Sequence, residues 1–149
     1  MPAATRHRGV APDESDPTVV HSLAVTTDDL VTAIEANVRR DAGAVLRVTP
    51  PFSGRMRARI HVEHDDDPPE PLCVPPERFV EPISPFPSPD TTEDELRADP
   101  DISYTRSRHR RRHEAAVEEW RAAIRESRRD RITVRIDDGS HEVRVAWLG

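Results

Sequence analysis

The stretch Arg55–Glu63, RMRARIHVE, decides how this chain folds. Its apolar residues alternate with arginines and a histidine, which is the pattern of a β-strand with one face packed on a core. We therefore predict a strand with two chemically different faces. The inward face carries Met56, Ala58, Ile60 and Val62, and the outward face carries Arg55, Arg57, Arg59 and His61.

A helix is expected before this strand, between two further strands. Thr26 and Asp29 have the spacing of a capping box, Leu30, Ile34 and Val38 repeat every four residues, and Gly43 supplies a stop signal. The flanking segments 18–25 (TVVHSLAV) and 44–49 (AVLRVT) are rich in β-branched residues and are predicted to be strands.

The C-terminal part predicts a long helix followed by a β-hairpin. The helix is expected from about residue 107 to 129. Its apolar face consists of His113, Ala116, Val117, Trp120, Ala123 and Ile124. Strands are expected at 131–136 and 141–148, joined by a turn with the sequence DDGS at 137–140.

The resulting order is β-α-β-β-arm-α-β-β, and the predicted fold class is α+β. We expect an antiparallel sheet with two helices on one face, either a ferredoxin-like fold with an extra strand or a duplicated αββ unit. The duplication is suggested because RRD follows an Ala-Ile pair in both halves, at 39–41 and at 128–130.

Two segments interrupt this order. Residues 1–17 are polar and contain three prolines, so they predict a disordered tail ahead of a single domain at 18–149. Residues 64–101 hold ten of the 15 prolines, twelve acidic residues and two arginines. We expect this insertion between the two halves to be an extended acidic arm lying on the domain, with short helices at 76–80 and 92–98.

The composition indicates the setting more than the activity. All 22 basic residues are arginine, 28 residues are acidic, and Asn37 is the only side-chain amide. In this composition the chain resembles small haloarchaeal proteins, although it matches no characterised family motif. With one cysteine, Cys73, the chain has no intramolecular disulfide. Because it has no long apolar run and no Sec signal peptide, we expect it in the cytoplasm.

The placement of the arginines suggests the candidate interaction residues. Arg47, Arg55, Arg57 and Arg59 are expected on one open sheet face. Arg135 and Arg144 of the second hairpin are candidates for the same face. The run Arg110–Arg112 lies near the start of the long helix, where we expect the arginines to spread around the helix. Because adjacent like charges repel, the acids of the arm (Asp65, Asp66, Asp67 and Glu70) could neutralise these cations internally. Phe79 and Phe86 of the arm are apolar candidates for contact with a partner.

The leading expectation is a non-enzymatic interaction or regulatory module whose partner is another protein, with no cofactor. Nucleic-acid binding through the arginines is the alternative, but the sheet face has no aromatic residue to stack bases. A metal-dependent enzyme using His109 and His113 is the third hypothesis, because their spacing suits a helical ligand pair; Cys73, His61 or His64 could complete a zinc site. The sequence contains no Gly-rich phosphate loop and no GxSxG motif, and no other catalytic signature is recognised.

Overall fold

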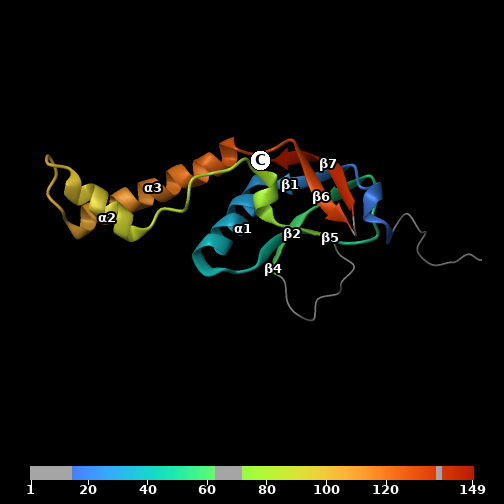
Figure 1. The fold of residues 1–149 in the computed structure, drawn as a ribbon, viewed down its shortest axis with the longest axis horizontal. Coiled ribbons are helices and arrows are strands. Elements are labelled where there is room, and N and C mark those ends of the chain that lie inside the picture. The colour runs from blue at the N-terminus through green and yellow to red at the C-terminus, as the bar shows by residue number, and fades with distance from the viewer. Residues whose placement is uncertain (1–14, 63–71, 137–138) are drawn as a thin grey trace, which may run out of the picture. The chain divides into compact units, whose positions relative to one another are not determined.

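The computed structural model describes residues 15–62, 72–136 and 139–149, and these form two compact units (Figure 1). The first unit combines the described residues up to Glu81 with Arg129–Gly149, and the second is Pro82–Arg128. The first contains two sheets and a helix, and the second is a helical hairpin. The predicted α+β class is therefore confirmed.

Sheet A is a mixed sheet in the first unit. Its strand order is β3-β1-β7-β6, in which β1 runs parallel to both β3 and β7, and β6 and β7 form an antiparallel pair. The strands are β1 (Ser22–Thr26), β3 (Arg55–Arg57), β6 (Arg131–Ile136) and β7 (Gly139–Leu148). The apolar residues Ile132, Val134, Val143 and Val145 of the predicted C-terminal hairpin are buried, whereas Ile136 and Trp147, at other alternate positions, are partly exposed.

Sheet B is antiparallel and has the order β4-β2-β5. Its strands are β2 (Ala44–Val48), β4 (Arg59–Val62) and β5 (Leu72–Val74). Strand β5 comes from the segment that was expected to be an arm. Its Leu72 and Val74 are buried, because pairing with β2 brings this part of the segment into the core.

The single strand expected at 55–63 is two strands in two sheets. The chain leaves sheet A after Arg57 and enters sheet B at Arg59, and Ala58 between them is completely buried. The backbone N–H of Ala58 donates to the carbonyl oxygen of Ala24 at 3.0 Å. The prediction of a single antiparallel sheet is therefore wrong. Alternation of apolar and polar residues indicates a strand, but it does not show with which neighbouring strand each residue pairs.

Helix α1 (Thr27–Arg40) begins at the predicted cap, where Thr26 Oγ1 accepts a hydrogen bond from the backbone N–H of Asp29 at 3.1 Å. Leu30 and Ile34 are buried, and the helix packs against β1, β2 and β4. Val38, expected on the same stripe, is half exposed at 50%. The helix ends at Asp41, whose φ of 52° lies in the left-handed region.

The remainder of the first unit contains two short 3₁₀ helices. The first is η3 (Pro17–Val19). The second, η4 (Pro76–Phe79), confirms the short helix expected at 76–80. It is joined to the start of the C-terminal strands, because the backbone N–H of Arg129 donates to Phe79 O at 2.8 Å and Arg129 Nε donates to Val80 O at 3.0 Å.

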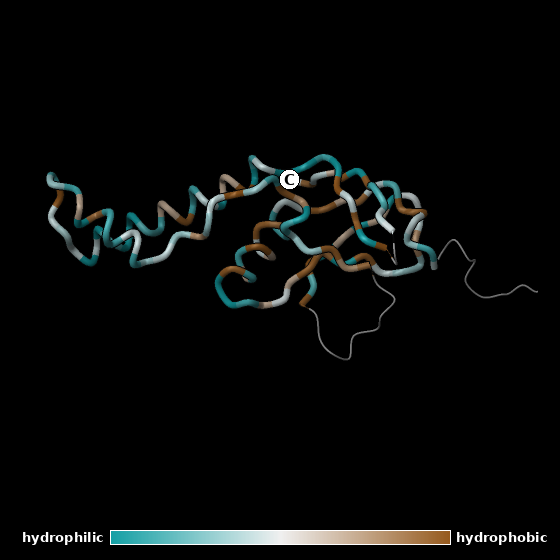
Figure 2. Tube along the Cα trace, viewed as in Figure 1, coloured by the Kyte–Doolittle hydropathy of each residue, from teal (hydrophilic) through white to brown (hydrophobic). Residues whose placement is uncertain are grey.

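The second unit pairs helix α2 (Pro89–Ala98) with helix α3 (Arg106–Glu126), which run side by side (Figure 1). Helix α2 begins three residues earlier than predicted, because Ser88 Oγ accepts the N–H of Thr91 at 3.1 Å and acts as the cap. Figure 2 shows α3 as largely hydrophilic with hydrophobic residues recurring along it. The buried ones are Val117, Trp120 and Ile124.

The prediction that the long helix packs on the sheet is wrong. This helix, α3, packs against α2 in the second unit. The internal duplication stays a prediction. Most of the expected tail, at 1–14, and the acids Asp65, Asp66, Asp67 and Glu70 lie outside the described residues. Of the helices that the structure describes, none is both long and apolar enough to cross a membrane.

Candidate functional site

Three arginines of α3 share one face near the start of the helix. Arg108, Arg111 and Arg112 follow the i, i+3, i+4 spacing that brings side chains together on a helix. Arg110, within the same run, is exposed and does not belong to this group. The sequence analysis expected the arginines to spread around the helix, and the structure shows that three of them gather around one hollow.

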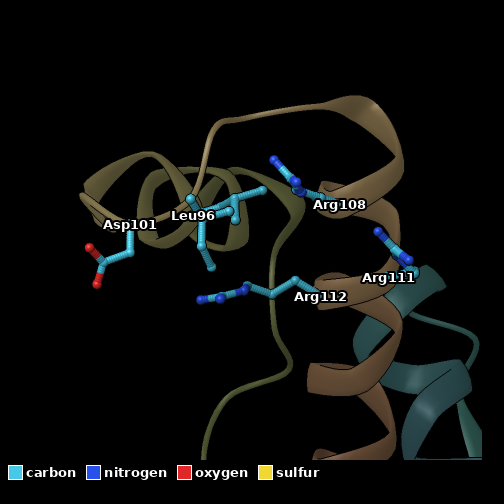
Figure 3. Close-up of a pocket in the computed structure, with 6 residues that line it drawn as sticks. Leu96, Asp101, Arg108, Arg111 and Arg112 are labelled. Carbon is cyan, nitrogen blue, oxygen red and sulfur yellow. The ribbon is translucent and has the colours of Figure 1, made fainter.

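We call this hollow the hairpin hollow. It lies between α3, the last turns of α2 and the loop that connects the two helices (Figure 3). Its volume is about 510 Å³. Leu96 of α2 and Ile102 of the connecting loop provide its apolar lining, and Asp101 completes it. Leu96 is only 1% exposed, so it forms a fixed floor beneath the arginines. Figure 3 shows Arg108 and Arg112 extending from α3 toward Leu96.

The charge of the hairpin hollow is largely uncompensated. Neither Arg111 nor Arg112 has a hydrogen bond or ion pair within the described part of the chain, and Arg108 Nη1 donates to the carbonyl oxygen of Ser103 at 2.7 Å. The Asp101 carboxylate points away from the three guanidinium groups (Figure 3). An anion in the hollow would therefore meet cations that no described carboxylate neutralises.

The helix dipole acts in the same direction. Helix α3 begins at Thr105, whose Oγ1 accepts the N–H of Arg108 at 3.0 Å, and its first turn carries no acidic side chain. The N-terminus of a helix bears a partial positive charge, which repels cations and attracts anions. Arg108, in the first turn, is thus placed where the helix itself disfavours a cation, and a bound anion would offset this repulsion.

Two histidines hold the hairpin together beside the hollow. His109 Nε2 donates to the carbonyl oxygen of Pro89 at 2.9 Å, and His113 Nδ1 lies 3.1 Å from the Thr92 hydroxyl. One ring nitrogen of each histidine therefore joins α3 to α2. Within the residues described, no three His, Cys, Asp or Glu side chains are grouped as a metal site would require, and the metal-pair hypothesis gains no further ligand.

A neighbouring arginine, Arg97, already has an anionic and an aromatic partner. Arg97 of α2 donates from Nε to Glu93 Oε2 at 2.9 Å, and its guanidinium carbon lies 3.8 Å from the centre of the Tyr104 ring. The hydrogen bond that Arg97 donates to Glu93 raises the pKa of Arg97 above its ordinary value. Arg97 is thus matched by a carboxylate and an aromatic ring, in contrast to Arg111 and Arg112.

The candidate arginines of the expected sheet face are divided between the two sheets. Arg55 and Arg57 lie in β3 of sheet A, whereas Arg47 and Arg59 lie opposite each other in β2 and β4 of sheet B. Arg135 and Arg144 belong to β6 and β7 of sheet A. Arg47, Arg57 and Arg59 still meet around a second hollow, because the crossing at Ala58 brings the ends of the two sheets together.

The two candidate phenylalanines have different surroundings. Phe79 is completely buried and packs edge-on against Trp147, with ring centroids 6.0 Å apart, so it belongs to the core and is not exposed to a partner. Phe86 is partly exposed and packs edge-on against Trp120 at 4.9 Å. Trp120 Nε1 also donates to Ser84 O at 3.0 Å, so Phe86 helps fix the segment before α2 along α3.

Sequence reasoning missed the floor of the hairpin hollow. The spacing of Arg108, Arg111 and Arg112 was visible in the sequence and could have indicated a shared face. Leu96 and Ile102 had no such signal, because they come from another helix and a loop that only the folded hairpin brings beneath the arginines.

The fold and this hollow define a small α+β protein whose helical hairpin carries a cluster of three arginines. Residues 10–149 match the family described as "Domain of unknown function (DUF8009)", and the chain belongs to this family. Neither the curated proteins nor the solved structures gave a match to the chain.

Proposed function

We propose that this protein is a non-enzymatic binding module that holds an acidic segment of a partner protein in the hairpin hollow. The observation that carries the proposal is the combination of Arg108, Arg111 and Arg112 with an apolar floor in one hollow. Carboxylates accept paired hydrogen bonds from guanidinium groups, and an apolar side chain next to them can cover the partly exposed Ile102.

A protein segment suits the hollow better than a nucleic acid. No aromatic side chain is among the residues that line it, so unstacked bases would find no stacking partner. Contacts to phosphates alone weaken steeply as salt rises, whereas apolar contacts do not depend on counterion release. We further propose that the interaction occurs in a cytoplasm rich in potassium salt, in keeping with the arginine-only, acidic composition.

The proposal is tested with a fluorescent peptide of alternating glutamate and leucine, titrated with the full chain at low and at multimolar KCl. Replacing both Arg111 and Arg112 by Gln should weaken peptide binding roughly tenfold or more, because charged hydrogen bonds are lost. Part of the affinity should persist at high KCl, because a leucine of the peptide still contacts the partly exposed Ile102. Fluorescence anisotropy measures both effects.

Arg110→Gln is the control for each single replacement, Arg111→Gln or Arg112→Gln, since it removes one charge from the same run without touching the hollow. It should leave peptide affinity nearly unchanged. Equal weakening by Arg110→Gln would show that net charge, and not the hollow, drives binding. If a single-stranded oligonucleotide binds more tightly than the peptide at both salt concentrations, the partner is a nucleic acid and not a protein.

A further inference from the structure

A second hollow lies in the first unit, where the chain passes from sheet A to sheet B. We call it the sheet hollow, and its volume is about 340 Å³. It is lined by Arg47, Thr49, Met56, Arg57, Arg59, Ile60 and His61. These residues come from β2, β3 and β4 or directly follow them, so the hollow depends on the crossing at Ala58.

The register of sheet B concentrates positive charge at this hollow. Arg47 and Arg59 are direct cross-strand partners, an arrangement in which two like charges repel. Arg47 Nη1 lies 3.1 Å from His61 Nε2. Because a guanidinium can only donate, His61 must accept this bond in its neutral form. The bond orients Arg47 but does not reduce the positive charge.

Arg57 adds a more specific indication of a ligand. Its Nε is buried and has no hydrogen-bond acceptor in the described part of the chain. A buried donor without an acceptor destabilises a fold, so such atoms are uncommon. Arg57 also lines the sheet hollow, so a small shift of its side chain would let an oxygen atom of an anion there accept from Nε.

We propose that the sheet hollow binds the phosphate group of a small phosphate monoester. Three guanidinium groups match the charge and the several acceptor oxygens of a phosphate better than those of a single carboxylate. Met56 and Ile60 give the ester substituent an apolar surface. No aromatic ring lines the hollow, which favours a small ester over a single-stranded nucleic acid.

This site involves none of the residues of the hairpin hollow, so it stands or fails independently of the proposed partner binding. The test follows the side-chain Nε–Hε signals of the full-length protein by NMR during titration with glycerol 3-phosphate and, separately, inorganic phosphate. The Arg57 signal should shift and saturate with both phosphates. Glycerol 3-phosphate should bind more tightly than inorganic phosphate, because the carbon chain of its substituent adds van der Waals contacts with Met56 and Ile60.

Two variants and one control make the result specific. Arg57→Gln should weaken phosphate binding roughly tenfold or more, since a charged hydrogen bond is lost. Arg59 is exposed, so Arg59→Gln should weaken phosphate binding without disturbing the core. Arg135→Gln removes an exposed charge at the opposite edge of sheet A from β3 and should change nothing.

Three results would overturn the proposal. The first is an Arg57 signal that does not respond to either phosphate. The second is equal loss of binding in Arg57→Gln and Arg135→Gln, which would indicate a general charge effect. The third is an oligonucleotide that engages the same residues far more tightly than glycerol 3-phosphate, which would assign the hollow to nucleic acid.

Discussion

At the scale of single residues, Asn37 links the end of α1 to the next strand. Its Nδ2 donates to the carbonyl oxygen of Ala44 at 2.9 Å, and its Oδ1 accepts the N–H of Ala44 at 2.7 Å. Ala44 is 2% exposed, so water has little access to replace these bonds. The only asparagine of the chain thus satisfies both backbone groups of the residue at which β2 begins.

Replacing Asn37 by Ala should lower the free energy of unfolding by about 2 kcal/mol, because both backbone groups of Ala44 lose their partner. Urea unfolding followed by tryptophan fluorescence measures the change. Thr32→Ala, at an exposed position of the same helix, is the control and should shift stability by less than about 0.5 kcal/mol. Similar stabilities for the two variants would contradict the role of Asn37.

Residue-scale features were the most predictable from the sequence. The Thr26 cap of α1 was predicted and confirmed, because a cap joins groups only three residues apart. The contact between Asn37 and Ala44 is also local, but asparagine side chains make many kinds of turn contact, and nothing in the sequence singled out this one.

At the scale of elements, the segment RMRARIHV is divided by one buried alanine. Ala58 is completely buried, and the strands on either side of it belong to different sheets. Alternation correctly indicated extended backbone over this segment. It did not indicate the change of partners, because hydrogen bonding between strands depends on segments that are distant in the sequence.

Ala58→Leu should destabilise the fold by about 1–3 kcal/mol, because added methylene groups in a filled interior force neighbouring side chains and backbone to shift. The matched control is Ala98→Leu at the exposed end of α2, which should have little effect. Urea denaturation of both variants measures the change in the free energy of unfolding. A neutral effect of Ala58→Leu would mean that the crossing has spare room.

At the scale of the whole molecule, the described residues form two compact units, and each has its own buried residues. Leu23 lies in β1 of the first unit, and Leu96 lies in α2 of the second. Both are almost completely buried, at 0% and 1% exposed. The two units therefore have separate packing interactions that a single substitution can disturb.

Leu96→Ala should accelerate amide hydrogen exchange throughout α2 and α3 while exchange in β1 and β7 stays near the wild-type rate. Leu23→Ala should do the reverse. The reason is that the cavity left by a truncated leucine costs about 2–5 kcal/mol in the unit that contains it. Exchange measured by mass spectrometry resolves the two regions, and uniform acceleration in both variants would show one cooperative unit.

The sequence by itself determined the α+β class, the presence of α1 and α3, and the C-terminal hairpin, because periodicity, caps and turns are local properties. The long helix was expected at about 107–129 and ends three residues earlier, at Glu126. It also named five of the six arginines that line the two hollows as candidate interaction residues, but not Arg108 and not the hollows themselves. Only the tertiary structure decided that Ala58 divides a strand between two sheets, that Phe79 is core, and that Leu96 lies beneath the arginines of α3. These outcomes depend on contacts between segments far apart in the chain, and a hollow forms only where such segments meet.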